Sequence, residues 1–124
     1  MILIVDDERD IRELLEEFFQ EEGYAVTTAA DGAGALRWLE RGGAPCVVIL
    51  DLLMPVMDGI ELYKTMQDDA RLSQIAVIIS TSDPGRAPSG VLTMKKPVNL
   101  MRLLAVVRQH CAGALAPGQV GAVA

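Results

Sequence analysis

Short apolar runs and segments of helical periodicity alternate along most of this chain. The apolar runs have the length of β-strands, and the third is rich in β-branched residues, as is typical of a strand buried on both faces. We predict five strands, at residues 1–5, 24–29, 46–50, 75–80 and 91–95.

Helices are predicted in three of the four intervals between these strands and after the last strand. Glycine often terminates helices, which places the ends of the first two at Gly23 and Gly42. Asp58 followed by Glu61 resembles a capping box and begins the third helix. The last helix follows Asn99 and carries apolar residues at helical spacing.

Alternation of strand and helix predicts an α/β fold with right-handed crossovers and a parallel sheet covered by helices on both faces. The exception is the interval 82–90, which contains two prolines and two glycines. These residues prevent a normal helix. We expect a loop there, with no more than one helical turn.

The bulk composition is that of one soluble globular domain, with 124 residues, 51% hydrophobic and 23% charged. We assign residues 1–111 to the domain and residues 112–124 to a flexible tail or the start of a linker. The longest apolar stretches, such as 46–50, are too short to span a bilayer, and no signal segment opens the sequence. We therefore expect a cytoplasmic protein with no membrane partner.

The net charge of −6 with eleven scattered basic residues argues against nucleic-acid binding by this domain. The negative charge is equally consistent with simple solubility and with a tuned acidic surface. Cys46 and Cys111 lack CxxC spacing and lie in apolar sequence. We expect buried free thiols here, in preference to a metal site or a disulfide.

Polar residues follow four of the five predicted strands. Asp6 and Asp7 follow the first, Asp51 the third, Thr81 the fourth and Lys96 the fifth. Ligands of open parallel sheets bind just beyond the carboxyl ends of the strands, so these groups are expected to converge. Three carboxylates, a hydroxyl and an ammonium suit a divalent cation and a phosphoryl group.

Each of these residues also has a simpler explanation. Asp51 is alternatively a helix cap or a solvated turn residue, and the acidic pair at 6–7 alternatively caps the first helix. Thr81 and its two serine neighbours are alternatively an ordinary polar strand end. Lys95 competes with Lys96, but strand alternation admits only one of them to the site. The position next to Pro97 favours Lys96.

Taken together, the acidic pair, the run Asp-Leu-Leu-Met-Pro-Val-Met-Asp-Gly at 51–59, Thr81 and Lys96-Pro97 resemble the response-regulator receiver domain over roughly residues 1–111. The resemblance implies a flavodoxin-like, doubly wound five-stranded parallel sheet of order 2-1-3-4-5. In this chain the fourth helix of that architecture is reduced to a loop.

The resemblance also implies a role for each site residue. Asp51 is the phospho-acceptor, which attacks the phosphorus of a phosphohistidine on a sensor histidine kinase or a phosphotransfer protein. Mg²⁺ is the implied cofactor: Asp7 binds it directly and Asp6 through water, together with Asp51 and the backbone carbonyl of Leu53.

The remaining implied roles concern the response to phosphorylation. Lys96 pairs with a phosphoryl oxygen, the bond before Pro97 is usually cis, and Thr81 stands at the position of the switch hydroxyl. Beyond its own phosphorylation and dephosphorylation we expect no turnover of an external substrate, so the chain is not predicted to be an enzyme. Phosphorylation would switch a surface offered to an output partner, which the sequence does not identify.

Two departures from the family pattern affect this interpretation. Only 15 residues separate Thr81 from Lys96 (96 − 81), and no aromatic residue lies between Tyr63 and Ala124. The usual coupling of a hydroxyl to an aromatic side chain is therefore not expected, nor is a normal dimer through the fourth-helix face. The alternative function is an interaction module that keeps the receiver fold and works without phosphate.

Overall fold

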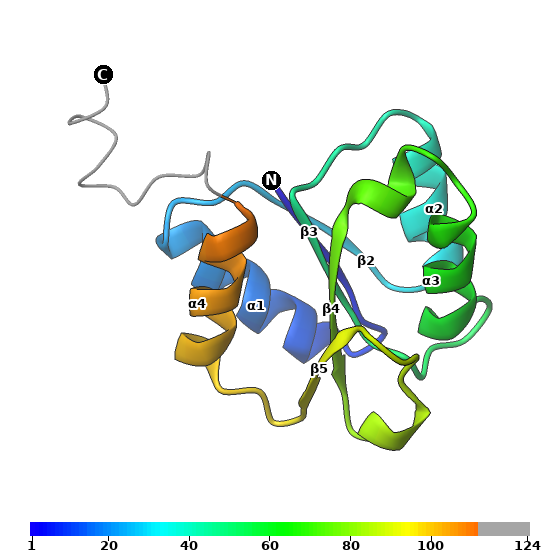
Figure 1. Cartoon of the computed structure of the whole chain (residues 1–124). Coiled ribbons are helices and arrows are strands. Elements are labelled where there is room, and N and C mark those ends of the chain that lie inside the picture. The colour runs from blue at the N-terminus through cyan, green and yellow to red at the C-terminus, as the bar shows by residue number, and fades with distance from the viewer. Residues whose placement is uncertain (112–124) are drawn as a thin grey trace.

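A computed structural model describes residues 1–111 of the chain, which form an α/β unit with a single five-stranded sheet (Figure 1). The strands are all parallel and lie in the order β2-β1-β3-β4-β5, as the resemblance implied. Their bounds are β1 Ile2–Val5, β2 Val26–Ala29, β3 Val47–Leu50, β4 Ala76–Thr81 and β5 Leu92–Lys95. The predicted tail at 112–124 lies outside the described residues.

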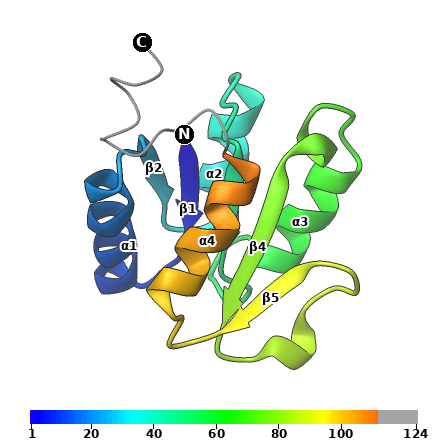
Figure 2. The ribbon, with the colours of Figure 1, turned by 60° about the vertical axis from the view of Figure 1, so that its left-hand side comes forward.

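Helices cover both faces of the sheet (Figures 1 and 2). The longer helices are α1 Arg9–Glu21, α2 Gly32–Glu40, α3 Gly59–Gln67 and α4 Leu100–His110. Side chains of α1 and α4 pack on one face, and those of α2 and α3 on the other. In the described part of the chain, no helix has the length and apolar character needed to cross a membrane.

Local sequence explains where these helices begin and end. Asp31, Asp58 and Asn99 are the N-cap residues of α2, α3 and α4, and each side chain accepts a backbone N–H three residues further on. The predicted start at Asp58 is confirmed. Gly23 and Gly42 follow α1 and α2 with φ of 95° and 103°, a conformation that glycine adopts without strain.

The connection from β4 to β5 lacks a full helix, as predicted. Within it the structure has one short 3₁₀ turn, Pro84–Arg86. Residues 82–86 are exposed, and the chain returns to the core only at Ala87 and Val91. The α2–α3 face of the sheet therefore has a loop beside β5 where the family architecture places a helix.

The prediction of free thiols is wrong. Cys46 and Cys111 form a disulfide, with their Cα atoms 5.3 Å apart. The two residues are 65 positions apart in sequence. They meet because the end of α4 returns to the edge of the sheet where β3 begins, and neither spacing nor local composition carries that information. Burial of the pair was expected and holds for Cys111, which is 2% exposed.

Candidate phosphoryl-acceptor and metal site

The sheet brings together the two aspartates that directly follow β1 and β3. These strands are adjacent, and their last residues, Val5 and Leu50, pair with each other. Asp6 and Asp51 come next, and the N–H of Asp51 donates to the carbonyl of Val5 at 2.9 Å. Because side chains alternate along a strand, both carboxylates lie on the face covered by α1 and α4.

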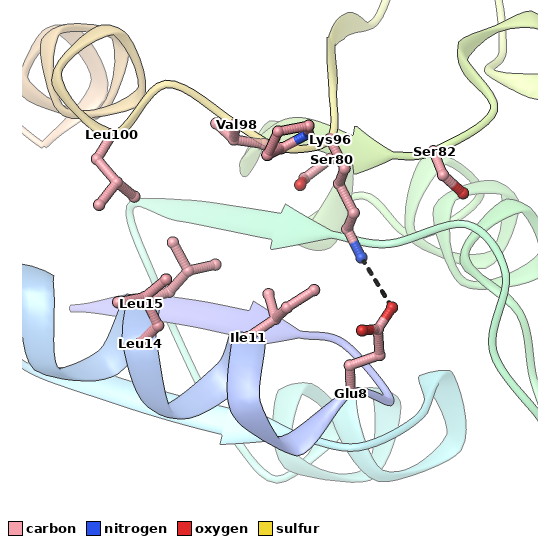
Figure 3. A pocket seen from close by; sticks show the side chains of 10 residues that line it. Glu8, Ile11, Leu14, Leu15, Ser80, Ser82, Lys96, Val98 and Leu100 are labelled. Carbon is pink, nitrogen blue, oxygen red and sulfur yellow. Dashed lines mark ion pairs between the residues drawn. The ribbon is translucent and has the colours of Figure 1, made fainter.

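Lys96 reaches these carboxylates from the end of β5. Its Nζ lies 2.8 Å from Asp6 Oδ2 and 3.4 Å from Asp51 Oδ2. Glu8 Oε1 lies 3.9 Å from the same nitrogen, an ion pair that Figure 3 shows. Its side chain is only 13% exposed, whereas Lys95 is exposed. The structure thus brings Lys96, and not Lys95, to the carboxylates, and the bond between Lys96 and Pro97 is cis, as the resemblance implied.

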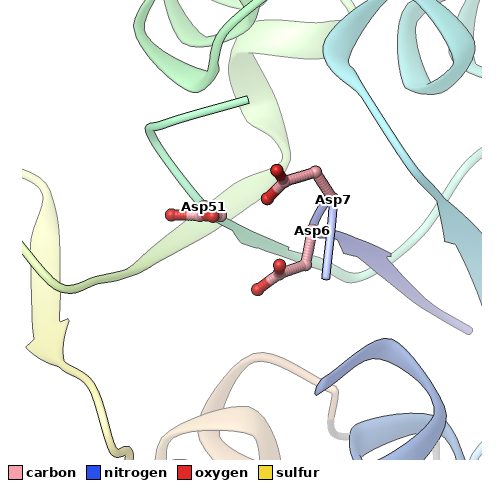
Figure 4. A group of neighbouring side chains, drawn as sticks. All are labelled: Asp6, Asp7 and Asp51. Carbon is pink, nitrogen blue, oxygen red and sulfur yellow. The ribbon is translucent and has the colours of Figure 1, made fainter. Parts of the chain in front are cut away.

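Asp7 completes a group of three carboxylates (Figure 4). One oxygen from each of Asp6, Asp7 and Asp51 lies within 4.8 Å of the others. Asp6 already uses both of its oxygens, because Oδ1 accepts the N–H of Glu8 at 2.9 Å and Oδ2 accepts Lys96 at 2.8 Å. Carboxylate oxygens are among the ligands that Mg²⁺ prefers, so the chemistry of this donor set suits the ion.

The charges in the site affect one another. Burial, and then the negative charge of Asp6, raise the pKa of the Asp51 carboxyl, and Lys96 offsets only part of this. Burial alone would lower the pKa of Lys96, but the hydrogen bond and charge of Asp6, followed by Asp51, raise it above its ordinary value. A cation is thus favoured beside Asp51, and Lys96 is held in its charged form.

The start of α3 packs closely against the backbone of the acceptor at Gly59. Burial raises the pKa of the Asp51 carboxyl, and the backbone of Leu53 offsets a small part of that rise. Gly59 donates its N–H to the carbonyl of Leu52 at 2.9 Å, and a Cβ at Gly59 would overlap the carbonyl oxygen of Asp51. Glycine is therefore required at 59. The role of the Leu53 carbonyl as a metal ligand stays a prediction.

Thr81 lies at the end of β4 with no exposed surface. Its Oγ1 accepts the N–H of Asp83 at 3.2 Å, and the described structure contains no hydrogen bond between Thr81 and Asp51. Alternation places Thr81 on the α2–α3 face, whereas Ser80 and Ser82 line the groove that Lys96 also lines. The switch role of Thr81 stays a prediction, and both serines remain candidates for it.

Sequence reasoning missed a groove of about 440 Å³ that extends from Lys96 between α1 and α4 (Figure 3). Its walls are mainly apolar, and Leu14 on α1 is 54% exposed. Glu8 stands at the end nearest Lys96. The sequence feature that could have indicated the groove is the apolar stripe of α1. This stripe includes Leu14, which is not buried in the core. The residues lining the groove are Glu8, Ile11, Leu14, Leu15, Ser80, Ser82, Lys96, Pro97, Val98 and Leu100.

Solved structures of similar fold are bacterial signalling proteins. The chemotaxis protein CheY4 of Vibrio cholerae has a TM-score of 0.76 and 30% identity, with 88% of this chain and 96% of that chain covered. The response regulator TrrA of Thermotoga maritima, solved in complex with Mg²⁺-BeF, has a TM-score of 0.76 and 34% identity, with 87% and 96% covered.

Curated relatives point the same way. Response regulator PleD of Caulobacter vibrioides is 37% identical over 115 residues, which cover 86% of this chain and 25% of that protein. Sporulation initiation phosphotransferase F of Bacillus subtilis is 48% identical over 66 residues, 53% of this chain and 52% of that protein. The chain thus spans about a quarter of the length of PleD. The family model described as the response regulator receiver domain matches residues 2–108, and the chain belongs to that family.

Proposed function

We propose that this chain is a phospho-accepting receiver of a two-component system or phosphorelay, in which Asp51 takes a phosphoryl group from a phosphohistidine. The observation that carries the proposal is the position of Lys96, whose Nζ lies 3.4 Å from the Asp51 carboxylate and 2.8 Å from that of Asp6. The ammonium group of Lys96 thus puts a positive charge beside the proposed nucleophile. A neighbouring carboxylate supplies the further acidic group that a metal cation would need.

In the proposed reaction an oxygen of Asp51 attacks phosphorus, the new P–O bond forms, and the P–N bond to the donor histidine breaks. The imidazole leaves with the electron pair of that bond. Lys96 pairs with a phosphoryl oxygen, which compensates the charge that arrives beside Asp51. The geometry calls for no general base, because the carboxylate is the nucleophile in its ionised form.

Asp7 and Asp51 are the proposed direct ligands of Mg²⁺, which when bound neutralises charge on the phosphoryl oxygens. Asp6 fits a water-mediated position, because both of its oxygens already accept hydrogen bonds from Glu8 and Lys96. The carbonyl of Leu53 is the proposed backbone ligand. In this arrangement Asp6 would hold Lys96 and also interact with the ion through water.

The proposed partners are a sensor histidine kinase or phosphotransfer protein as donor, and an output protein or domain as receiver of the signal. The groove beside Lys96 adjoins the acceptor and offers apolar surface for the donor. We propose a cytoplasmic, non-enzymatic domain that binds neither nucleic acid nor membrane. With a loop in place of the fourth helix, we do not propose the dimer that uses that face.

The proposal is tested by intact mass after incubation with acetyl phosphate or phosphoramidate, with and without Mg²⁺. We expect one phosphoryl adduct that requires Mg²⁺ and is absent in Asp51→Asn. Thr81→Ala, Ser80→Ala and Ser82→Ala then identify the hydroxyl that answers the phosphoryl group, since only that variant should lose the phosphorylation-dependent change in amide exchange of the β4–β5 loop.

A second function is an interaction module that works without phosphate, and the missing helix between β4 and β5 favours it. It predicts that Mg²⁺ binds and that no adduct forms with either small donor or with the cognate kinase. A Mg²⁺-dependent adduct on Asp51 would exclude it.

A further inference from the structure

The disulfide between Cys46 and Cys111 lies at the opposite end of the sheet from Asp51. Cys46 immediately precedes β3, whose other end leads into Asp51, and its N–H donates to the carbonyl of Met1 at 2.9 Å. Cys111 is the C-cap residue of α4. In both ribbon views the last turn of α4 lies beside the start of β1 (Figures 1 and 2). The bond therefore joins a terminal helix to the centre of the sheet.

Cys111 is the last attachment of α4 to the core. Val107 is fully buried, but the three residues that follow it are exposed. One of them, Arg108, approaches Glu22, the C-cap residue of α1, at 3.5 Å, and a surface pair of this kind adds little stability. If the bond to Cys46 is broken, two kinds of interaction still hold the final turn of α4 in place. They are its own helical N–H to carbonyl hydrogen bonds and the packing of the Cys111 side chain.

The two cysteine residues differ in exposure. Cys46 is partly exposed, whereas Cys111 is 2% exposed and belongs to the core cluster. An external thiol or disulfide can thus reach Cys46 first, and Cys111 is placed to resolve the product. Disulfides in a reducing cytoplasm are usually transient and regulatory, so in the location proposed above this pair would not serve as a permanent bond.

We propose that Cys46 and Cys111 are a redox modification site, oxidised and reduced by exchange with a small thiol–disulfide couple such as glutathione, that fixes or releases the last turn of α4. The inference rests on the proposed cytoplasmic location and not on phosphoryl transfer.

Oxidised glutathione is the oxidant that accepts the electrons when the two cysteines form their disulfide. The Cys46 thiolate attacks one sulfur of that disulfide, forming a mixed disulfide and expelling one glutathione thiolate. The Cys111 thiolate then attacks the sulfur of Cys46 and expels the second. The two cysteine thiols lose two electrons and two protons, and one oxidised glutathione becomes two glutathione thiols. Reduction by excess glutathione runs through the same steps in reverse.

The first test equilibrates the full chain in glutathione buffers of different ratios, blocks free thiols with an alkylating agent and measures intact mass. We expect a change from two alkyl groups to none as the buffer becomes oxidising. Two labelled thiols at every ratio would overturn the proposal. A bond that persists in a large excess of reduced glutathione would also overturn it, because the disulfide would then be permanent.

Single variants test the difference in access. With oxidised glutathione, Cys111→Ser should accumulate the mixed disulfide on Cys46, whereas Cys46→Ser should react far more slowly at buried Cys111. Equal rates would refute Cys46 as the point of entry. Asp51 lies at the other end of the sheet, so phosphorylation measured in parallel separates a failure of this proposal from a failure of the proposed receiver function.

Amide exchange and melting report the release of α4 directly. On reduction we expect faster exchange in the last turn of α4 and a thermal midpoint lower by roughly 10 °C, because the bond closes a long loop. The double variant Cys46→Ser/Cys111→Ser should melt at one temperature in both buffers. Unchanged exchange in α4 between oxidised and reduced wild type would sink the idea of a release.

Discussion

Val56 is the one non-glycine residue in the described structure with a positive φ, at 69°. It lies in the loop between Asp51 and α3, and its side chain is 82% exposed. A β-branched residue in this conformation places its Cβ against its own backbone, which costs about 1–2 kcal/mol. The loop therefore holds Val56 in a backbone conformation that a β-branched residue disfavours.

Val56→Gly should raise the free energy of unfolding by about 1 kcal/mol. Glycine removes the clash, and the greater freedom of the unfolded chain offsets only part of that gain. Little buried surface is lost, since the valine is exposed. Urea unfolding measures the change, and Val56→Ala, which keeps a Cβ, should gain less. A loss of stability in Val56→Gly would show that the valine side chain makes a contact that matters.

Lys96 compensates two carboxylates in a site with little solvent. Lys96→Ala should lower the free energy of unfolding by about 3 kcal/mol in Mg²⁺-free buffer, because it leaves Asp6 buried and unpaired. Lys95→Ala is the matched control, one residue earlier and exposed, and should change stability by no more than about 0.5 kcal/mol. Equal effects in the two variants would contradict the assignment of the charge pair to Lys96.

At the scale of elements, the β4–β5 connection is the part of the fold where this chain differs from its family. Its one helical turn is Pro84–Arg86, and Asp83 and Arg86 form an exposed ion pair at 3.1 Å. Exposed backbone of this kind exchanges its amide protons readily. A loop that starts next to Thr81 is a suitable element for an order–disorder response to a phosphoryl group.

Phosphorylation should slow amide exchange across residues 82–90 and leave α1 unchanged as an internal reference. The physical reason is that a hydroxyl drawn toward the phosphoryl group pulls the adjoining backbone with it. Hydrogen–deuterium exchange with mass detection compares the acetyl-phosphate-treated wild type with Asp51→Asn treated identically. Exchange that is the same in both would rule out this loop as the responding element.

Elements were predictable where the signal is local. Apolar runs identified all five strands, and Asp58 and Asn99 identified helix starts, because capping and burial act over a few residues. The convergence of Asp6, Asp51 and Lys96 also followed, since parallel strands end at a common edge.

What could not be predicted depends on distant parts of the chain meeting. The disulfide requires that the end of α4 and the start of β3 adjoin, and the groove beside Lys96 requires the spacing of α1 from α4. Thr81 shows a finer limit. The fact that it follows a strand was plain, but whether its hydroxyl or that of a neighbouring serine faces the site depends on side-chain alternation at the strand end.

At the scale of the whole molecule, the charged site and the disulfide lie at opposite ends of the sheet. The carboxylates and Lys96 lie at the carboxyl ends of the strands, and the Cys46–Cys111 bond lies at the other end. Three carboxylates held within 4.8 Å of one another work against folding, because burial and like charge both disfavour ionised Asp51. The domain as a whole is therefore less stable than its core alone would make it.

The unfavourable ionisation of Asp51 in the folded state determines how the free energy of unfolding should depend on pH. The folded pKa of Asp51 is raised, so the stability linked to its protonation is fully present below the ordinary carboxyl pKa of about 4 and is lost as pH rises through the raised value. Without Mg²⁺, Asp51→Asn should be more stable than wild type at neutral pH. The difference should shrink toward zero as the pH falls through that window, when wild-type Asp51 also becomes neutral.

Mg²⁺ should reverse the order at neutral pH. Binding to the folded state stabilises by mass action, and wild type keeps all three carboxylates whereas Asp51→Asn keeps two. Thermal melts of both proteins in EDTA and in Mg²⁺, at several pH values, measure this directly, and excess EDTA should restore the original order. The opposite result, a wild type more stable than Asp51→Asn in EDTA at neutral pH, would show that Lys96 fully offsets the cost of ionising Asp51 in the folded state. Cation binding at this edge of the sheet would then have to depend on the negative charge of Asp7.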